Sequence, residues 1–116
     1  MRWKVVALAV SPMVMITWDV VSTPDTWKDY AERSNAWVNM LVACDGVDEL
    51  RAYWSLTGLS PQRGVVCEFR SETLARHAIE NWNHIFQDMR AHGVVNIEAR
   101  LFVPSEVYPH PIRKEQ

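Results

Sequence analysis

The sequence predicts an α+β fold, in which a four-stranded antiparallel sheet carries two helices on one face. Residues 48–71 alternate between apolar and polar side chains on either side of a loop rich in turn-forming residues, which is typical of a hairpin. Residues 13–21 and 94–103 alternate with the same period of two. A stretch with helical spacing of apolar residues follows the first of these strands, and another precedes the last.

The composition is that of one globular domain. A chain of 116 residues with 48% hydrophobic and 22% charged residues can bury a core of its own. The net charge of −2 gives no broad attraction to phosphate, so nucleic acid is not an expected partner. The apolar run at 5–10 is too short to cross a membrane, and no membrane partner is expected. Cys44 and Cys67 are too few for a disulfide framework, so we expect reduced thiols and a cytoplasmic protein.

The first strand and the first helix are expected within residues 13–46. Thr23 can cap a helix that begins at Pro24, and Asp25 suits the positive end of that helix. Gly46 is expected to end the helix in a left-handed conformation. The inward-facing residues of this strand and helix are Val14, Ile16, Trp18, Val20, Trp27, Tyr30, Ala31, Ser34, Trp37, Val38, Leu41 and Val42.

The hairpin, the second helix and the last strand follow. The second helix begins at Ser71 and Glu72 and is expected to continue to Gly93 with one unbroken apolar face. The expected turn residues of the hairpin are Gly58, Ser60, Pro61 and Gly64. The inward-facing residues are Leu50, Ala52, Trp54, Leu56, Val65, Cys67, Phe69, Leu74, Ala78, Trp82, Ile85, Phe86, Met89, Val95, Ile97, Ala99, Leu101 and Val103.

The order strand, helix, strand, strand, helix, strand is the ferredoxin-like βαββαβ arrangement, with both helices on one face of the sheet. We assign residues 13–104 to this α+β domain. Residues 1–12 are expected to form an N-terminal arm or an extra strand. Residues 105–116 are expected to form an extended C-terminal tail, because Pro109 and Pro111 disfavour a helix or a central strand.

The sheet face that points away from the helices, which we call the outer face, mixes charged, aromatic and aliphatic side chains. A fully solvated face would not need the apolar members, and a core would not tolerate the arginines. We therefore expect another sheet to cover this face around a polar cavity. Its members are Met15, Thr17, Asp19, Arg51, Tyr53, Ser55, Val66, Glu68, Arg70, Asn96, Glu98, Arg100 and Phe102.

Three segments resemble the dimeric α+β barrel superfamily: ELRAYWSLTG at 49–58, VVCEFRSETLA at 65–75 and RAHGVVNIEARLF at 90–102. This superfamily includes antibiotic-biosynthesis-type monooxygenases, haem-degrading monooxygenases and stress-responsive proteins. The resemblance implies a homodimer through the outer face and a cavity for a small molecule. The first hypothesis is a cofactor-independent monooxygenase-like enzyme acting on a small aromatic or enolic molecule. The alternative is a non-catalytic dimeric binding or stress-responsive protein.

The candidate site consists of polar side chains on the outer face. Arginines can hold an anionic or enolic substrate, and a tyrosine can donate or accept a proton. The predicted catalytic residues are Tyr53, Glu68 and Arg70, and the predicted substrate-binding residues are Asp19, Arg51, Glu98 and Arg100. The alternative interpretation is a set of cross-strand ion pairs that stabilise the sheet or the dimer.

No metal or cofactor is expected. His77, Glu80 and His84 have a spacing that a metal could use, but they lie on a helix face that points into water. The haem-degrading members would supply a strand asparagine and a helical tryptophan and histidine. Here Asp19 is the nearest strand residue, and core packing explains Trp82 better. The six tryptophans leave room for a flat aromatic ligand between helix and sheet.

Overall fold

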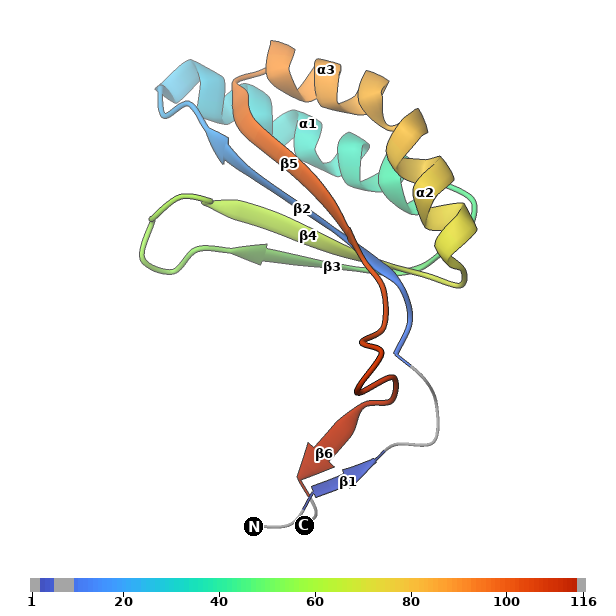
Figure 1. The fold of residues 1–116 in the computed structure, drawn as a ribbon. Coiled ribbons are helices and arrows are strands. Elements are labelled where there is room, and N and C mark those ends of the chain that lie inside the picture. The colour runs from blue at the N-terminus through green and yellow to red at the C-terminus, as the bar shows by residue number, and fades with distance from the viewer. Residues whose placement is uncertain (1–2, 6–9, 115–116) are drawn as a thin grey trace.

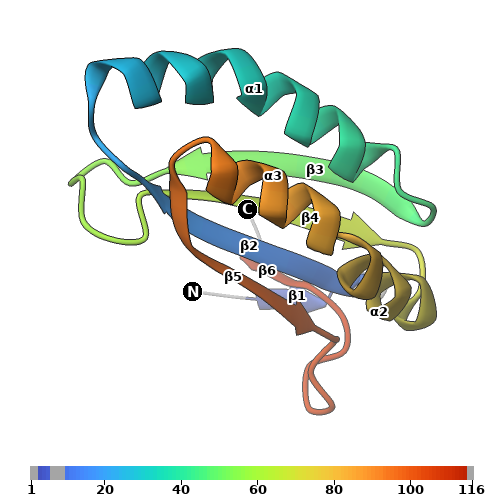
Figure 2. The same cartoon turned by 90° about the horizontal axis from the view of Figure 1, so that it is seen from above.

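The computed structural model describes residues 3–5 and 10–114 of the chain (Figure 1). Its elements are β1 (Trp3–Val5), β2 (Met13–Val20), α1 (Pro24–Val42), β3 (Val47–Trp54), β4 (Arg63–Phe69), α2 (Glu72–Asn81), α3 (Asn83–Ala91), β5 (Val94–Phe102) and β6 (Ile112–Lys114). One antiparallel sheet has the strand order β3-β4-β2-β5, and β1 pairs with β6 in a separate ribbon. All three labelled helices lie on one face of the four-stranded sheet (Figures 1 and 2). The predicted ferredoxin-like arrangement is therefore confirmed.

The core lies between the four-stranded sheet and the helices. The central strands β2 and β4 contribute Ile16 and Phe69, which are fully buried, and the helices contribute Leu41, Trp82 and Met89. Burying an aliphatic or aromatic side chain of this size contributes about 1.5–3 kcal/mol relative to leaving it exposed. The predicted alternation of β2 and β4 is therefore correct, and it supplies the surface on which the helices pack.

Helix α1 begins where the sequence predicts. The Thr26 N–H donates to Thr23 Oγ1 at 3.3 Å, and Pro24 is the first helical residue. The helix ends at Val42, before the glycine that was expected to end it. Gly46 has a φ of +92°, so its left-handed conformation is confirmed. It lies in the turn that leads into β3 and not at the helix end.

The second predicted helix consists of two helices, so the prediction of one unbroken helix is wrong. Helix α2 ends at Asn81 and α3 begins at Asn83. At the joint the Ile85 N–H donates to the Trp82 carbonyl at 2.9 Å, and His84 Nδ1 lies 2.8 Å from the Asn81 carbonyl oxygen. A tighter turn thus replaces one turn of regular helix. The apolar face continues across the joint, since Trp82 and Ile85 are both buried.

Strand β5 departs from the expected alternation near its start. The register between β2 and β5 shifts between Thr17 and Asp19, so β5 has an extra residue there. Asn96, at this bulge, has a φ of +57°, a left-handed conformation that asparagine tolerates better than most residues. As a consequence Val94 is fully buried while Val95 is 39% exposed, and the inward position predicted for Val95 is wrong.

The β3–β4 hairpin differs from the prediction at its loop. Strand β3 ends at Trp54, so Leu56 lies in the loop and is 87% exposed instead of facing the core. Gly64, expected in the turn, belongs to β4. Gln62 Oε1 accepts a hydrogen bond of 2.9 Å from the Val20 N–H, which holds the returning chain next to β2.

The two ends of the chain meet in the β1–β6 ribbon. The strands are antiparallel, with Lys4 opposite Arg113, and the Val10 N–H donates to the Pro109 carbonyl at 2.9 Å. The ribbon projects from the side of the sheet that the helices leave bare (Figure 1), and it lies beneath the sheet when seen from above (Figure 2). It makes the molecule elongated, with a longest extent of 50 Å and a radius of gyration of 16.3 Å. A compact chain of this length has a radius of gyration of about 13 Å.

Candidate functional site

The outer face brings most of the predicted site residues onto one surface. In two rows across the outer face, the central strands β4 and β2 carry uncharged side chains, and charged side chains lie on the edge strands β3 and β5. Glu68 on β4 and Asp19 on β2 are charged and lie outside these two rows. One row across the sheet is Arg51, Val66, Met15 and Arg100, and the next is Tyr53, Gly64, Thr17 and Glu98. The outer face therefore has an apolar centre with a charged rim.

The charged residues of the outer face are paired with one another or with a neighbour. Arg51 Nη2 lies 2.8 Å from Glu68 Oε1, and this carboxylate raises the pKa of the guanidinium. Arg100 is 2.9 Å from Glu98. Arg70 lies 3.3 Å from Asp45, outside the predicted set. Because these pairs are largely exposed, solvent and salt screen them, and they contribute little to stability.

The catalytic and substrate-binding roles of this face stay predictions. Tyr53 is 57% exposed, and its hydroxyl makes no hydrogen bond within the part of the chain that the structure describes. The ion pair between Arg51 and Glu68 joins two strands, as the alternative interpretation expects. The geometry thus accounts for these charges without a ligand.

Asp19 serves a different purpose from the other predicted site residues. Its carboxylate accepts hydrogen bonds from Ser60 Oγ at 2.5 Å, from the Gln62 N–H at 2.8 Å and from Asn96 Nδ2 at 2.9 Å. The hydrogen bonds from Ser60 and Asn96 lower the pKa of this carboxyl, and the one from Ser60 has the larger effect. Burial acts in the opposite direction and raises the pKa. Asp19 is only 8% exposed and fastens the loop of residues 55–62 to the sheet.

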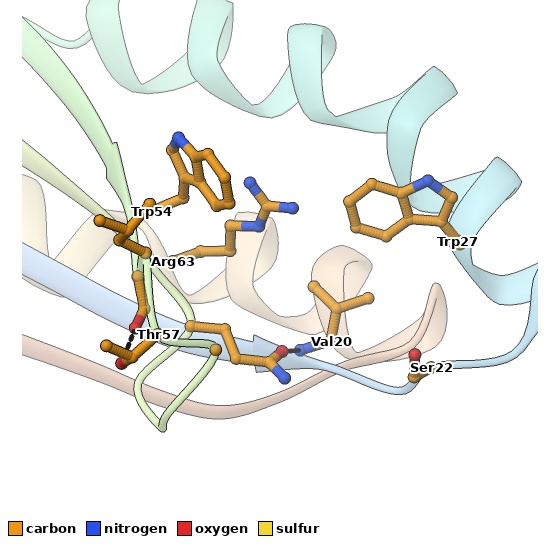
Figure 3. A pocket seen from close by; sticks show the side chains of 10 residues that line it. Val20, Ser22, Trp27, Trp54, Thr57 and Arg63 are labelled. Carbon is orange, nitrogen blue, oxygen red and sulfur yellow. Dashed lines mark hydrogen bonds between the residues drawn. The ribbon is translucent and has the colours of Figure 1, made fainter.

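A second candidate site lies on the opposite side of the sheet, between α1 and the edge strand β3. Two cavities of about 390 Å³ and 240 Å³ share Trp54 and Arg63, and we call them together the cleft. The larger cavity lies beside the loop of residues 55–62 (Figure 3). The smaller cavity extends under α1. The aromatic residues that line the cleft are Trp18, Trp27, Tyr30, Trp37, Tyr53 and Trp54.

Arg63 lies at the centre of the cleft. Its Cζ atom is 5.0 Å from the ring centroid of Trp27 on α1 and 5.7 Å from that of Trp54 on β3 (Figure 3). Both distances fit cation–π contacts. Among residues 10–114 no carboxylate lies within 4.0 Å of this guanidinium, and the lining of the cleft contains no Asp, Glu or His. The cleft therefore presents a positive charge between flat apolar surfaces, which suits a planar anion.

The sequence interpretation placed two residues of the cleft in the core, and this is wrong. Trp27 is 46% exposed and Trp54 is 65% exposed, because α1 does not cover the end of β3 closely. Arg63 was missing from the predicted site. The signal for it is present in the sequence: along β4, Arg63 alternates in step with Val65 and Cys67 and so points to the helix side of the sheet. An arginine on that side needs open space around its charge.

The contacts of Cys67, Trp82 and His92 are those of residues that support the fold. Cys67 is fully buried, as expected, and burial raises the pKa of its thiol to about 12. Trp82 is 2% exposed and packs against Phe69 and Phe86. His92 lies between Asp29 of α1 and Asp88 of α3, at 3.7 Å and 3.6 Å.

Metal sites and membrane spans are absent from what the structure describes. No group of three or more His, Cys, Asp or Glu residues within residues 3–5 and 10–114 could hold a metal ion. None of the helices placed by the structure has the length and the apolar character needed to cross a bilayer.

Comparison with known proteins supports the fold. No protein-family model matches the chain, and no curated protein matches its sequence. Among solved structures, a DABB family protein with a ferredoxin-like fold from Mesorhizobium loti superimposes with a TM-score of 0.64 at 12% identity, covering 81% of this chain and 96% of the other. A dimeric ferredoxin-like protein of unknown function from Jannaschia gives 0.57 at 11% identity over 80% and 98% of the two chains. SnoaB, a cofactor-independent oxygenase from Streptomyces nogalater, gives 0.54 at 12% identity over 86% and 99%.

The chain thus has the ferredoxin-like fold of DABB and monooxygenase-like proteins, which confirms the fold that the resemblance implied. Some of these neighbours are oxygenases and others have no known function, and at this level of identity the likeness extends to the fold alone.

Proposed function

We propose that the protein is a cofactor-independent monooxygenase-like enzyme, which binds a small aromatic or enolic molecule in the cleft between α1 and the sheet. The observation that carries this proposal is the position of Arg63 between Trp27 and Trp54. Its guanidinium has no carboxylate partner among the described residues. The fold shared with SnoaB, described as a cofactor-independent oxygenase, supports the same class of reaction.

In this class of reaction the substrate supplies the electrons. An acidic phenol or enol loses a proton, and the resulting anion reduces dioxygen. A methylene carbon next to the anionic system becomes a carbonyl: one oxygen atom enters the substrate, and the other leaves as water. Arg63 would stabilise the negative charge of the anion, while the two indoles orient its plane.

The composition of the cleft sets a requirement on the substrate. Because its lining holds no Asp, Glu or His, no strong general base faces a bound molecule. The substrate must therefore ionise readily near neutral pH, with Arg63 favouring the ionised form. Hydroxylated anthrones are enolisable phenols, and they change absorbance when oxidised to quinones.

The test is the oxidation of dithranol, a dihydroxyanthrone, followed by oxygen uptake and quinone absorbance. Arg63→Ala should lower kcat/KM at least about tenfold, because it removes a charged contact of roughly 1.5–3 kcal/mol. Arg76→Ala is the matched control, since Arg76 pairs with Glu72 on the exposed side of α2. If Arg70→Ala abolishes turnover while Arg63→Ala does not, the outer face is the site and the cleft proposal fails.

We also propose a homodimer in which two outer faces meet. An apolar centre within a charged rim is the usual anatomy of a protein interface, and a structural neighbour is described as dimeric. Arg51→Glu leaves Glu68 without its partner and places like charges on one strand, so it should shift the protein toward monomer in sedimentation equilibrium. Arg76→Glu, on the helix side, should not. A cytoplasmic location remains part of the proposal, based on the two free thiols.

A non-catalytic binding protein is the second candidate, and the absence of Asp, Glu and His from the cleft lining favours it. The same probe separates the two functions. Quenching of tryptophan fluorescence by dithranol that is lost in Arg63→Ala, without oxygen uptake in either protein, would assign the cleft to binding alone.

A further inference from the structure

The two chain ends form a structure that is not explained by the domain itself. We call β1 together with residues 103–114 the terminal arm. Its ribbon has three residues in each strand and pairs with no strand of the four-stranded sheet. An isolated two-stranded ribbon is marginally stable in water, and three or more strands or a packed face are normally needed. Among the described residues, the ribbon of the terminal arm therefore has no further strand to complete it.

The terminal arm exposes apolar side chains. Val107 is 75% exposed and Tyr108 is 62% exposed, and Val103 and Ile112 are 50% and 39% exposed. Val107, Tyr108 and Ile112 line one hollow of the arm together, and Phe102 is 45% exposed on the outer face at the end of β5. A cluster of exposed apolar side chains on a projecting arm is typical of an interface.

The direction of the arm identifies the occupant. The ribbon projects from the side of the sheet opposite to the helices and lies below the sheet, so it reaches into the space in front of the outer face (Figures 1 and 2). In a dimer joined through the outer faces, a second copy fills that space. The charges also fit: Arg113 and Lys114 are exposed on β6, and Asp45, Asp48 and Glu49 are exposed around the start of β3. Asp45 and Glu49 also pair with Arg70 and Arg51 of their own chain.

We infer that the terminal arm is a clasp that packs against the flank of a second copy of this chain. By the twofold symmetry of a dimer, each protomer both extends an arm and receives one. The inference rests on the proposed dimer and adds a contact that the sheet faces alone do not provide. Val107 and Tyr108 are the side chains that become buried.

The test compares dimer dissociation constants by sedimentation equilibrium. The double variant Val107→Ser, Tyr108→Ser should raise the dissociation constant at least about tenfold, because symmetry removes each apolar contact twice. Val42→Ser is the matched control: Val42 is 47% exposed on α1, on the other side of the sheet, and its replacement should leave the constant unchanged.

Cross-linking gives an independent measurement. Tyr108→p-benzoylphenylalanine, in a mixture of ¹⁵N-labelled and unlabelled chains, should yield photoproducts that join a labelled to an unlabelled peptide. Products within one chain only would overturn the clasp. If Arg51→Glu dissociates the dimer but the double variant Val107→Ser, Tyr108→Ser does not, the clasp is overturned and the proposed dimer stands. A monomeric wild type would overturn both.

Discussion

Replacing Asp19 with asparagine tests how the loop of residues 55–62 is held against the sheet. The carboxylate accepts three hydrogen bonds, from Ser60, from the Gln62 backbone and from Asn96. An asparagine has nearly the same shape but a single acceptor oxygen and an amide group that is itself a donor. At least one of the three donors must then face another donor, and the charge of the acceptor is lost.

The expected cost follows from the difference between charged and neutral hydrogen bonds. A hydrogen bond to a charged group contributes about 1.5–3 kcal/mol and a neutral one about 0.5–1.5 kcal/mol, so each bond loses about 1 kcal/mol. Three bonds would give about 3 kcal/mol, but Ser60 is exposed and can turn to water. We expect Asp19→Asn to lower the free energy of unfolding by about 2–3 kcal/mol at pH 7.

The effect should depend on pH in a defined direction. The hydrogen bonds lower the pKa of Asp19 in the folded state, so its stabilisation is present above the unfolded pKa of about 4 and is lost as the pH falls through the folded value. Urea unfolding followed by tryptophan fluorescence should show the wild type and Asp19→Asn converging in acid. Asp48→Asn is the control, since Asp48 is exposed and no described side chain or N–H bonds to it.

A difference between wild type and Asp19→Asn smaller than about 0.5 kcal/mol at pH 7, the scale of ordinary surface substitutions, would refute the reasoning. A larger difference that stays constant from pH 7 down to pH 2 would also refute it. That result would assign the loss to packing and not to the ionised carboxylate.

Two further predictions concern the backbone and the thiols. Gly93→Ala should lower the melting temperature strongly in calorimetry, because the residue has a φ of +88° and a Cβ there would collide with the Thr26 methyl. Gly58→Ala is the control: its φ is +74°, but no atom lies within 4 Å of the added Cβ, so it should cost only about 1–2 kcal/mol for backbone strain. Equal losses in the two variants would contradict the predicted clash at Gly93. Iodoacetamide at pH 8 should alkylate Cys44 well before Cys67, whose thiol is fully buried with a pKa near 12, and equal rates by mass spectrometry would contradict this assignment.

The fold could be predicted because its elements carry strong local signals. Alternation on β2 and β4, and the Thr23-Pro24 start of α1, each determine an element without help from the rest of the chain. The errors occur where tertiary contacts decide the backbone. The bulge at Asn96 depends on Asp19 across the sheet, and the division between α2 and α3 depends on a side chain that bonds a backbone carbonyl.

The candidate site was harder to predict, for a physical reason. The alternation of residues along a strand assigns each side chain to one face of the sheet, but it does not tell whether that face is covered. Trp54 and Arg63 have inward parity at the end of the hairpin, where α1 lies too far from the sheet to bury them. The open space between helix and sheet, which makes the cleft, comes from the placement of α1 and has no counterpart in local periodicity.

The hydrogen bonds of Asp19 also bear on the order in which the cleft is assembled. They join β2 to the hairpin loop across 41 and 43 residues, and to β5 across 77 residues. Closing a loop of that length is the entropically costly part of folding, so the contact to β5 forms after the hairpin is in place. During synthesis the chain emerges from the ribosome N-terminus first, so the bonds from Ser60 and Gln62 can form before β5 is available, whereas the bond from Asn96 must wait for β5. The loop wall of the cleft therefore gains its last hydrogen-bonded support late, although most of the residues that line the cleft are made in the first half of the chain.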